Sequence, residues 1–177
     1  MEIIFALITV LLLLSFLLKS TFLPRWGVGV TALLMALTVR LVIPFLASQP
    51  AETVNGWIFS PDRVLDIAVC IVLEALLMMA FCFSRTLSRF RFLRWYPGLL
   101  AFPAVCWAWG QLLYSSAGIH FTRFAIWAAL GTLVVVLVGS WGLRRLLPEE
   151  DIRLEGLFLI QLFLLLLTIA ATGAITF

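Results

Sequence analysis

The chain has 177 residues, of which 64% are hydrophobic and only 12% are charged, and its formal net charge is +3. A soluble domain is about half apolar and a quarter charged, and so short a fold cannot cover this much apolar surface by itself. The composition therefore excludes a soluble globular protein. The net positive charge does not indicate a nucleic-acid partner, because the basic residues lie between apolar runs.

Six apolar runs follow one another along the chain, and each approaches the roughly 20 residues with which a helix spans a bilayer. They cover residues 3–18, 26–47, 64–83, 96–116, 124–143 and 154–177. None alternates polar and apolar residues as the wall of a β-barrel does. We expect an all-α integral membrane protein, a compact bundle of about six transmembrane helices with short loops. Residues 1–177 then form a single transmembrane domain.

Proline and acidic residues mark several of the predicted helix starts. Ser60, Pro61 and Asp62 are typical of an N-cap, a proline at the first helical position and an acid in the first turn. Pro148, followed by three acidic residues, gives the same signal before the last run. Tyr96 and Pro97 are interpreted as the start of the fourth helix.

The basic residues between the runs indicate which ends of the helices face the cytoplasm. Nine of them lie in the loops at 19–25, 84–95 and 144–153, whereas the alternate loops hold only Arg63 and Arg123. The positive-inside rule therefore places the three basic loops in the cytoplasm and both termini outside. The compact chain and this strong bias predict a bacterial inner membrane as the location.

Three ionisable residues lie within the predicted membrane-spanning part, where a charge costs about 2.5–3.5 kcal/mol. Arg40 lies seven residues inside the outer end of the second run. Asp66 lies near the start of the third run, and Glu74 lies about 15 Å deep in it at 1.5 Å per residue. If the second and third helices form a hairpin, Arg40 lies at a depth between the two carboxylates and can pair with either.

The third run places Asp66, Cys70, Glu74 and Met78 at successive i, i+4 steps, which share one stripe of a helix. Arg40 facing this stripe would complete a buried polar network. One interpretation is a proton or ion pathway, or a polar docking point for another subunit. The other is a static ion pair that locks two helices together.

Other polar residues inside the runs are expected to serve packing. Gln111 and Gln161 can form hydrogen bonds across helix interfaces. The first and sixth runs have uncharged, leucine-rich middles, at 11–14 and 164–167. We expect these two helices to face lipid or a partner, with the second and third at the polar centre.

The sequence contains no motif that predicts catalysis. It has no nucleotide-binding P-loop, no G-x-S-x-G and no H-E-x-x-H. Its one histidine, His120, and its three cysteines have no spacing that predicts a metal or haem site. We therefore expect no enzyme activity, no cofactor and no metal.

Two functions remain open at this point. The first is a non-catalytic subunit of a larger inner-membrane complex, in energy-coupled transport or ion-driven assembly, with other membrane subunits and the lipid bilayer as partners. The polar network of Arg40, Asp66 and Glu74 would then serve docking or ion passage. The alternative is a small transporter or channel, acting alone or as a homo-oligomer, that uses the same residues.

Overall fold

The structure is a computed structural model of the chain that describes residues 2–83, 93, 95–115 and 120–173. Within these ranges the fold is all-α, as expected, with seven helices and no strand. The helices are α1 (Glu2–Ser20), α2 (Arg25–Ala47), α3 (Ala51–Ile58), α4 (Pro61–Phe83), α5 (Ala101–Ser115), α6 (Phe121–Leu146) and α7 (Glu150–Gly173). The basic residues Arg85, Arg89, Arg91 and Arg94 lie outside the described ranges.

Five of these helices, α1, α2, α4, α6 and α7, are long and apolar enough to cross a membrane. The chain is therefore a multi-pass membrane protein in contact with a lipid bilayer. Helix α4 begins at Pro61, as predicted, with an acidic residue in its first turn. Helix α7 begins at Glu150, two residues after the predicted first position at Pro148, and has two acidic residues in its first turn.

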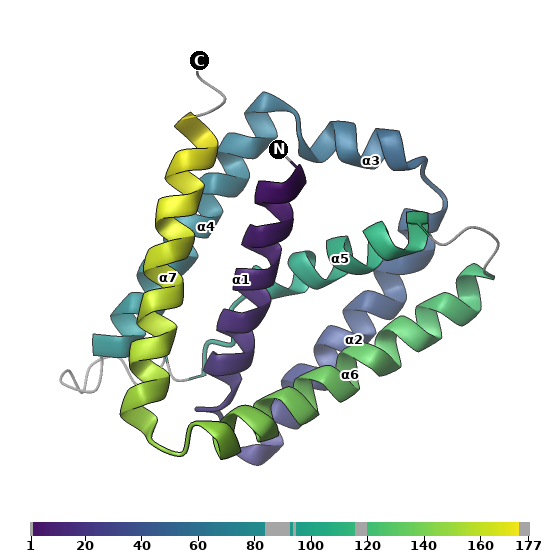
Figure 1. Ribbon diagram of the computed structural model, residues 1–177. Helices are drawn as coiled ribbons and strands as arrows, with labels where there is room; N and C mark the ends of the chain where they lie inside the picture. The colour runs from purple at the N-terminus through teal and green to yellow at the C-terminus, as the bar shows by residue number, and fades with distance from the viewer. Residues whose placement is uncertain (1, 84–92, 94, 116–119, 174–177) are drawn as a thin grey trace.

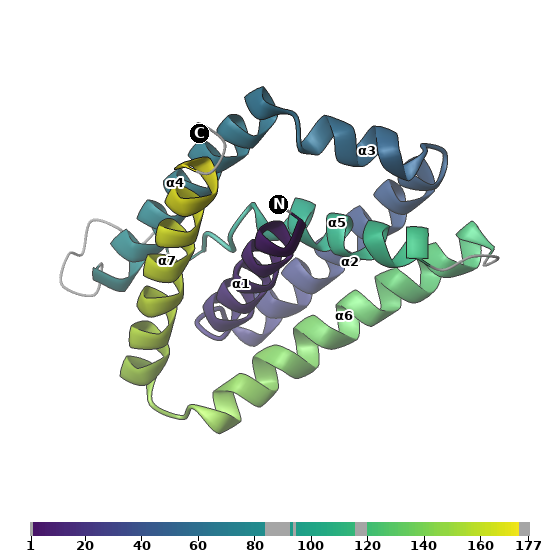
Figure 2. The ribbon, with the colours of Figure 1, turned by 45° about the horizontal axis from the view of Figure 1, so that its top comes forward.

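Helix α1 lies between two pairs of helices (Figures 1 and 2). Helix α2 packs along α6 and α4 packs along α7, while α1 contacts α5, α6 and α7. Ile8, Leu12 and Phe16 of α1 are buried in the core. The expectation that the first helix lies at the periphery is wrong, because leucine suits a protein interior as well as a lipid contact. The expected hairpin of the second and third runs does not form either, since α2 and α4 pack on different helices.

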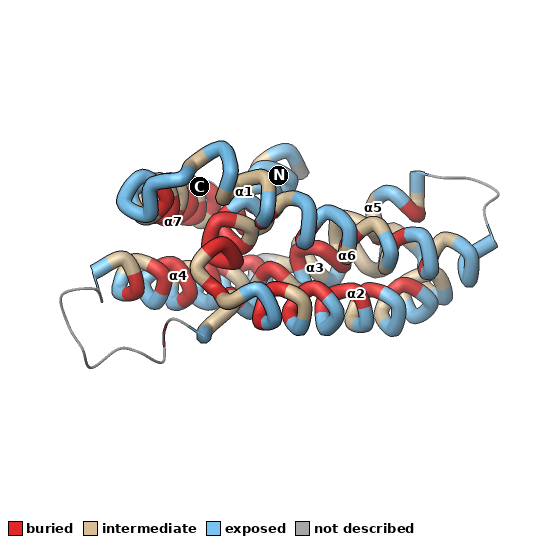
Figure 3. The backbone as a smooth tube through the Cα atoms, turned by 90° about the horizontal axis from the view of Figure 1, so that it is seen from below, coloured by how far each residue is buried: buried red, intermediate tan, exposed pale blue. Residues whose placement is uncertain are grey.

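The outer sides of the long helices are apolar and uncovered. Figure 3 shows exposed residues along the outward faces and buried residues where helices meet. Leu33 of α2, Val69 of α4 and Val138 of α6 are each about half exposed or more. A bilayer covers such surfaces without cost, since its hydrocarbon core is as apolar as the side chains.

The fourth apolar run differs from the prediction. Its helix, α5, begins at Ala101 instead of Tyr96 and has 15 residues, which span about 22 Å at 1.5 Å per residue, short of a hydrocarbon core of about 30 Å. The residues from Trp95 to Leu100 are not helical. Pro97 and Gly98 break the helix here, and Gly98 has a φ of +94°, which favours glycine.

Over this segment the chain nevertheless passes from a point near the end of α1 to a point near its start. The carbonyl of Leu93 accepts a hydrogen bond from Lys19 near the end of α1. Farther along, the Phe102 ring meets Phe16, and the Trp107 ring meets Phe5 near the start of α1. The fourth apolar run is therefore discontinuous, not helical at 95–100 and helical from Ala101 to Ser115.

Both described chain ends lie at the same end of the bundle, which we call the N-terminal end (Figure 1). The connections from α1 to α2 and from α6 to α7 lie at the opposite end, together with the end of α4. The short helix α3 lies across the N-terminal end between α2 and α4. Its Trp57 is 60% exposed.

Candidate functional site

Glu74 lies at the break in the fourth span. Its side chain is buried, with 7% exposure, in the middle of α4. The backbone N–H of Leu100, just before α5, donates a hydrogen bond of 2.8 Å to Glu74 Oε2. The hydroxyl of Tyr96 donates to the same oxygen at 3.3 Å. The Glu74 carboxylate thus binds the non-helical segment near its start, at Tyr96, and at its end, at Leu100.

The unpaired N–H groups in the first turn of α5 explain why a carboxylate lies here. The first N–H groups of any helix lack a partner within the helix, and no water replaces that partner in a hydrocarbon core. A carboxylate at a helix N-terminus also lies at the positive end of the helix dipole. Glu74 therefore acts as an N-cap for α5 that comes from another helix.

Gly98 allows the close approach of the segment to α4. A Cβ atom added to Gly98 would lie 3.0 Å from Met78 Cε and 3.2 Å from Glu74 Oε1. Both distances are tighter than usual for a side chain, and the positive φ disfavours any residue with a Cβ. Gly98 is therefore part of the Glu74 site, and sequence analysis did not single it out.

Arg40 does not lie at this site. It is exposed on the outward face of α2, a helix that packs on α5 and α6 and not along α4. Among the described residues it forms no ion pair with Glu74 or with Asp66. The structure thus brings together Glu74, Tyr96 and Gly98, but it does not bring together the three residues of the expected polar network.

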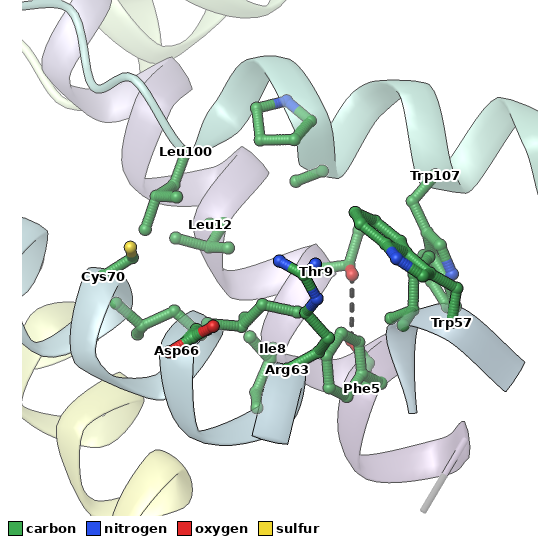
Figure 4. A pocket seen from close by; sticks show the side chains of 15 residues that line it. Phe5, Ile8, Thr9, Leu12, Trp57, Arg63, Asp66, Cys70, Leu100 and Trp107 are labelled. Atoms are coloured by element: carbon green, nitrogen blue, oxygen red, sulfur yellow. Dashed lines mark hydrogen bonds between the residues drawn. The ribbon is translucent and has the colours of Figure 1, made fainter. Parts of the chain in front are cut away.

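Asp66 lines a separate cavity of about 330 Å³ between α1, α3, α4 and α5 (Figure 4). Arg63, one turn earlier in α4, lines the same cavity. Apolar residues from all four helices make up most of its wall, including Ile8, Ile58 and Ala104. The cavity is close to the discontinuous span, since Leu100 also lines it.

Both glutamines form polar contacts between elements. Gln111 of α5 donates a hydrogen bond of 2.9 Å to the side chain of Asn55 in α3. Gln161 of α7 donates to the hydroxyl of Ser15 in α1, and both side chains are buried. These contacts attach α3 to α5 and α7 to α1.

Two basic side chains at the end opposite the N-terminal end, the buried Lys19 and the half-buried Arg144, were not expected to contact the interior. Lys19 is 0% exposed, and its Nζ donates a hydrogen bond of 2.9 Å to the Leu93 carbonyl. Arg144 donates to the carbonyls of Ser20, the last residue of α1, and of Leu23, three residues later. Arg144 satisfies carbonyls at the C-terminus of α1, where positive charge is favourable, and Lys19 lies in the last turn of the same helix. The only sequence feature that indicated this burial is the position of Lys19 directly after the apolar run 3–18.

The arrangement supplies polar contacts between helices and a largely apolar cavity. No group of three or more histidine, cysteine or acidic residues that could hold a metal occurs within the described ranges. Comparisons with models of known protein families, with curated proteins and with solved structures find no match to this chain.

Proposed function

We propose that the chain is a non-catalytic integral membrane subunit of a larger bacterial inner-membrane complex, in energy-coupled transport or ion-driven assembly. The observation that supports this most is the position of Arg40. Its side chain is exposed on the outward face of a membrane-spanning helix. Within the described chain it has no hydrogen-bond or ion-pair partner.

The surroundings of Arg40 on α2 are apolar. Leu33, Leu37 and Leu41 are exposed on the same side of the helix or next to it, with exposures between 49% and 66%. A charged side chain in such a setting costs about 2.5–3.5 kcal/mol in a bilayer. A partner helix with a carboxylate at the depth of Arg40 removes most of this cost. The outward face of α2 is therefore the proposed docking surface for another subunit.

Site-specific photo-crosslinking in the native membrane tests this proposal. A photoreactive amino acid at Leu37, one turn from Arg40, should give a crosslink to one defined membrane protein. The matched control is Val138, which is exposed on the lipid-facing side of α6 and should give no protein crosslink. Arg40→Lys should keep the crosslink, whereas Arg40→Glu should abolish it.

The identity of the crosslinked species decides between the possible outcomes. A different membrane protein with an acidic residue in the crosslinked helix supports the subunit. Crosslinks to lipid alone, or a crosslink that persists in Arg40→Glu, contradict it. A crosslink to a second copy of the same chain supports the other candidate function.

The second candidate is a small transporter or channel that acts as a homo-oligomer. The discontinuous fourth span favours it, because transporters commonly place interrupted helices at mid-membrane sites. Here the N-terminal end of α5 meets Glu74 inside the bundle. Flux of ions or solutes through purified protein in liposomes, lost in Glu74→Gln, would support this function over the first.

A further inference from the structure

The cavity beside Asp66 combines an apolar interior with two opposite charges. Figure 4 shows Arg63 and Asp66 extending from α4 into the space between the helices, where Leu12 and Leu100 also line the cavity. Both charged residues are exposed, whereas Ile8 and Ala104 of the inner wall are 4% and 8% exposed. The cavity is therefore polar at its opening and apolar at depth.

The two charges do not neutralise each other. Arg63 and Asp66 lie three positions apart in α4, which places their Cβ atoms about 5–6 Å apart. No ion pair joins them within the described residues, and the Arg63 guanidinium instead lies over the Trp57 ring, 4.8 Å from its centroid. One cation and one anion thus stand side by side, each available to a ligand.

The opening of the cavity lies along a surface that lipid covers. Leu65, Val69 and Leu73 of α4 are exposed by 49–58% beside it. An apolar cavity does not retain water, because water there lacks polar partners. A hydrocarbon chain fills such a space and adds dispersion contacts with its wall.

From this geometry we propose that the cavity is a binding site for a zwitterionic aminophospholipid, with an acyl chain between α1, α4 and α5. The phosphate of the headgroup binds Arg63, and its primary ammonium group binds Asp66. A headgroup with phosphate and amine a few bonds apart matches the adjacent charges, whereas a fatty acid or an anionic phospholipid leaves Asp66 without a cation. This proposal does not depend on the docking of another subunit.

Photo-crosslinking with the unaltered full-length chain tests the position of the acyl chain. The chain is reconstituted in nanodiscs that contain phosphatidylethanolamine with a photoreactive group in one acyl chain, and the labelled peptides are mapped by mass spectrometry. Labels at the buried residues Ile8 or Ala104 place the acyl chain in the cavity, because lipid that surrounds the protein cannot reach them. Labels confined to exposed positions such as Leu65 and Val69 overturn the proposal.

Native mass spectrometry of protein purified in mild detergent tests the headgroup. The unaltered chain should retain phosphatidylethanolamine in preference to phosphatidylglycerol and oleate. Arg63→Gln should weaken retention of both phospholipids about tenfold, as expected for the loss of one charge-assisted hydrogen bond. Asp66→Asn should remove the preference for phosphatidylethanolamine and leave phosphatidylglycerol retained. Equal retention of the two phospholipids by the unaltered chain, or a preference for oleate, overturns the proposal.

A matched pair of α4 variants separates the cavity from the general lipid surface. Cys70→Phe fills the cavity from its exposed edge, since Cys70 is exposed and lines it. Val69→Phe adds the same ring to the neighbouring lipid-facing position, outside the cavity lining. Cys70→Phe should lose the retained lipid and Val69→Phe should keep it. Equal retention by the two variants contradicts the assignment.

Discussion

The carboxylate of Glu74 accepts a hydrogen bond of 2.8 Å from the backbone N–H of Leu100, a residue 26 positions later in the chain. Through this bond the middle of α4 supports the beginning of α5. In most helices a neighbouring Ser, Thr or Asp supplies the cap. Here the residues before α5 are Tyr96, Pro97, Gly98 and two leucines, so the cap has to come from another helix.

Replacing Glu74 should therefore destabilise the protein mainly through α5. Glu74→Met removes every acceptor and leaves a buried N–H unsatisfied, at a cost of about 1–3 kcal/mol. Glu74→Gln keeps one acceptor oxygen and should cost less. The thermal loss of monodisperse protein in mild detergent measures both changes. Equal stability of Glu74→Met and the unaltered chain would show that the bond to Leu100 does not support the fold.

Gly98→Ala should also destabilise the protein, because the backbone at Gly98 is left-handed and the new methyl group would crowd Met78. The left-handed conformation alone costs about 1–2 kcal/mol for a residue with a Cβ. The matched control is Gly142→Ala in α6, where a Cβ meets no neighbour within 4 Å. That change should be neutral or slightly stabilising, because alanine favours a helix. Equal melting temperatures of the two variants would contradict the left-handed backbone at Gly98.

Arg40→Met and Glu74→Gln should have additive effects on the amount of assembled protein. The two residues lie on helices that do not pack along each other, and they share no hydrogen-bond partner within the described chain. Effects of separate sites usually add within about 0.3–0.5 kcal/mol. If the double variant recovers assembly that each single variant loses, the two residues form a pair and the described arrangement is wrong.

The discontinuous span makes a specific prediction about sidedness. In a chain without native cysteines, single cysteines at Glu52 in α3 and at His120 before α6 should react with an impermeant thiol reagent from the same side of the membrane. A cysteine at Glu149 should react only from the other side, which the distribution of basic residues predicts to be cytoplasmic. If the chain between α4 and α6 returned without crossing, Glu52 and His120 would react from opposite sides.

Asn55 and Gln111 should act as a unit that holds α3 against α5. Asn55→Leu or Gln111→Leu should each increase hydrogen exchange in Ala51–Ile58, since each removes the same hydrogen bond of 2.9 Å. The double variant should exchange no faster than either single variant. A similar change at the half-buried Gln49, two residues before α3, is the control and should leave exchange unchanged.

The long helices could be predicted from the sequence because their apolar runs match the thickness of a bilayer, and the starts at Pro61 and Glu150 because proline and acidic residues mark them. Which helices pack together could not be predicted in this way. A membrane helix is apolar on its lipid side and on its protein side, so hydrophobic periodicity does not identify the buried face. Arg40 illustrates the difficulty. The sequence predicts its depth along α2, but it does not predict the direction in which the side chain points.

The break before α5 was marked in the sequence by Pro97, Gly98 and Pro103. The length of the apolar run favours a continuous helix, but the two prolines and the glycine outweigh it. The cap by Glu74 had no local signal, because its partner is a backbone N–H that could lie in any segment at that depth. The expected pairing of Glu74 with Arg40 rested on their opposite charges and similar depth, and neither property indicates which groups lie at the end of a neighbouring helix.

The shortness of α5 has a consequence for how the chain enters the membrane during synthesis. The described residues before α5, Leu93 and 95–100, form no regular α-helix, so alone in lipid their N–H and C=O groups would lack partners. Lys19 of α1 and Glu74 of α4 supply two of those partners, and both helices are synthesised earlier. This segment is therefore expected to leave the translocation channel only after α1 and α4 have come together, so the earlier helices act as an internal insertion scaffold for it.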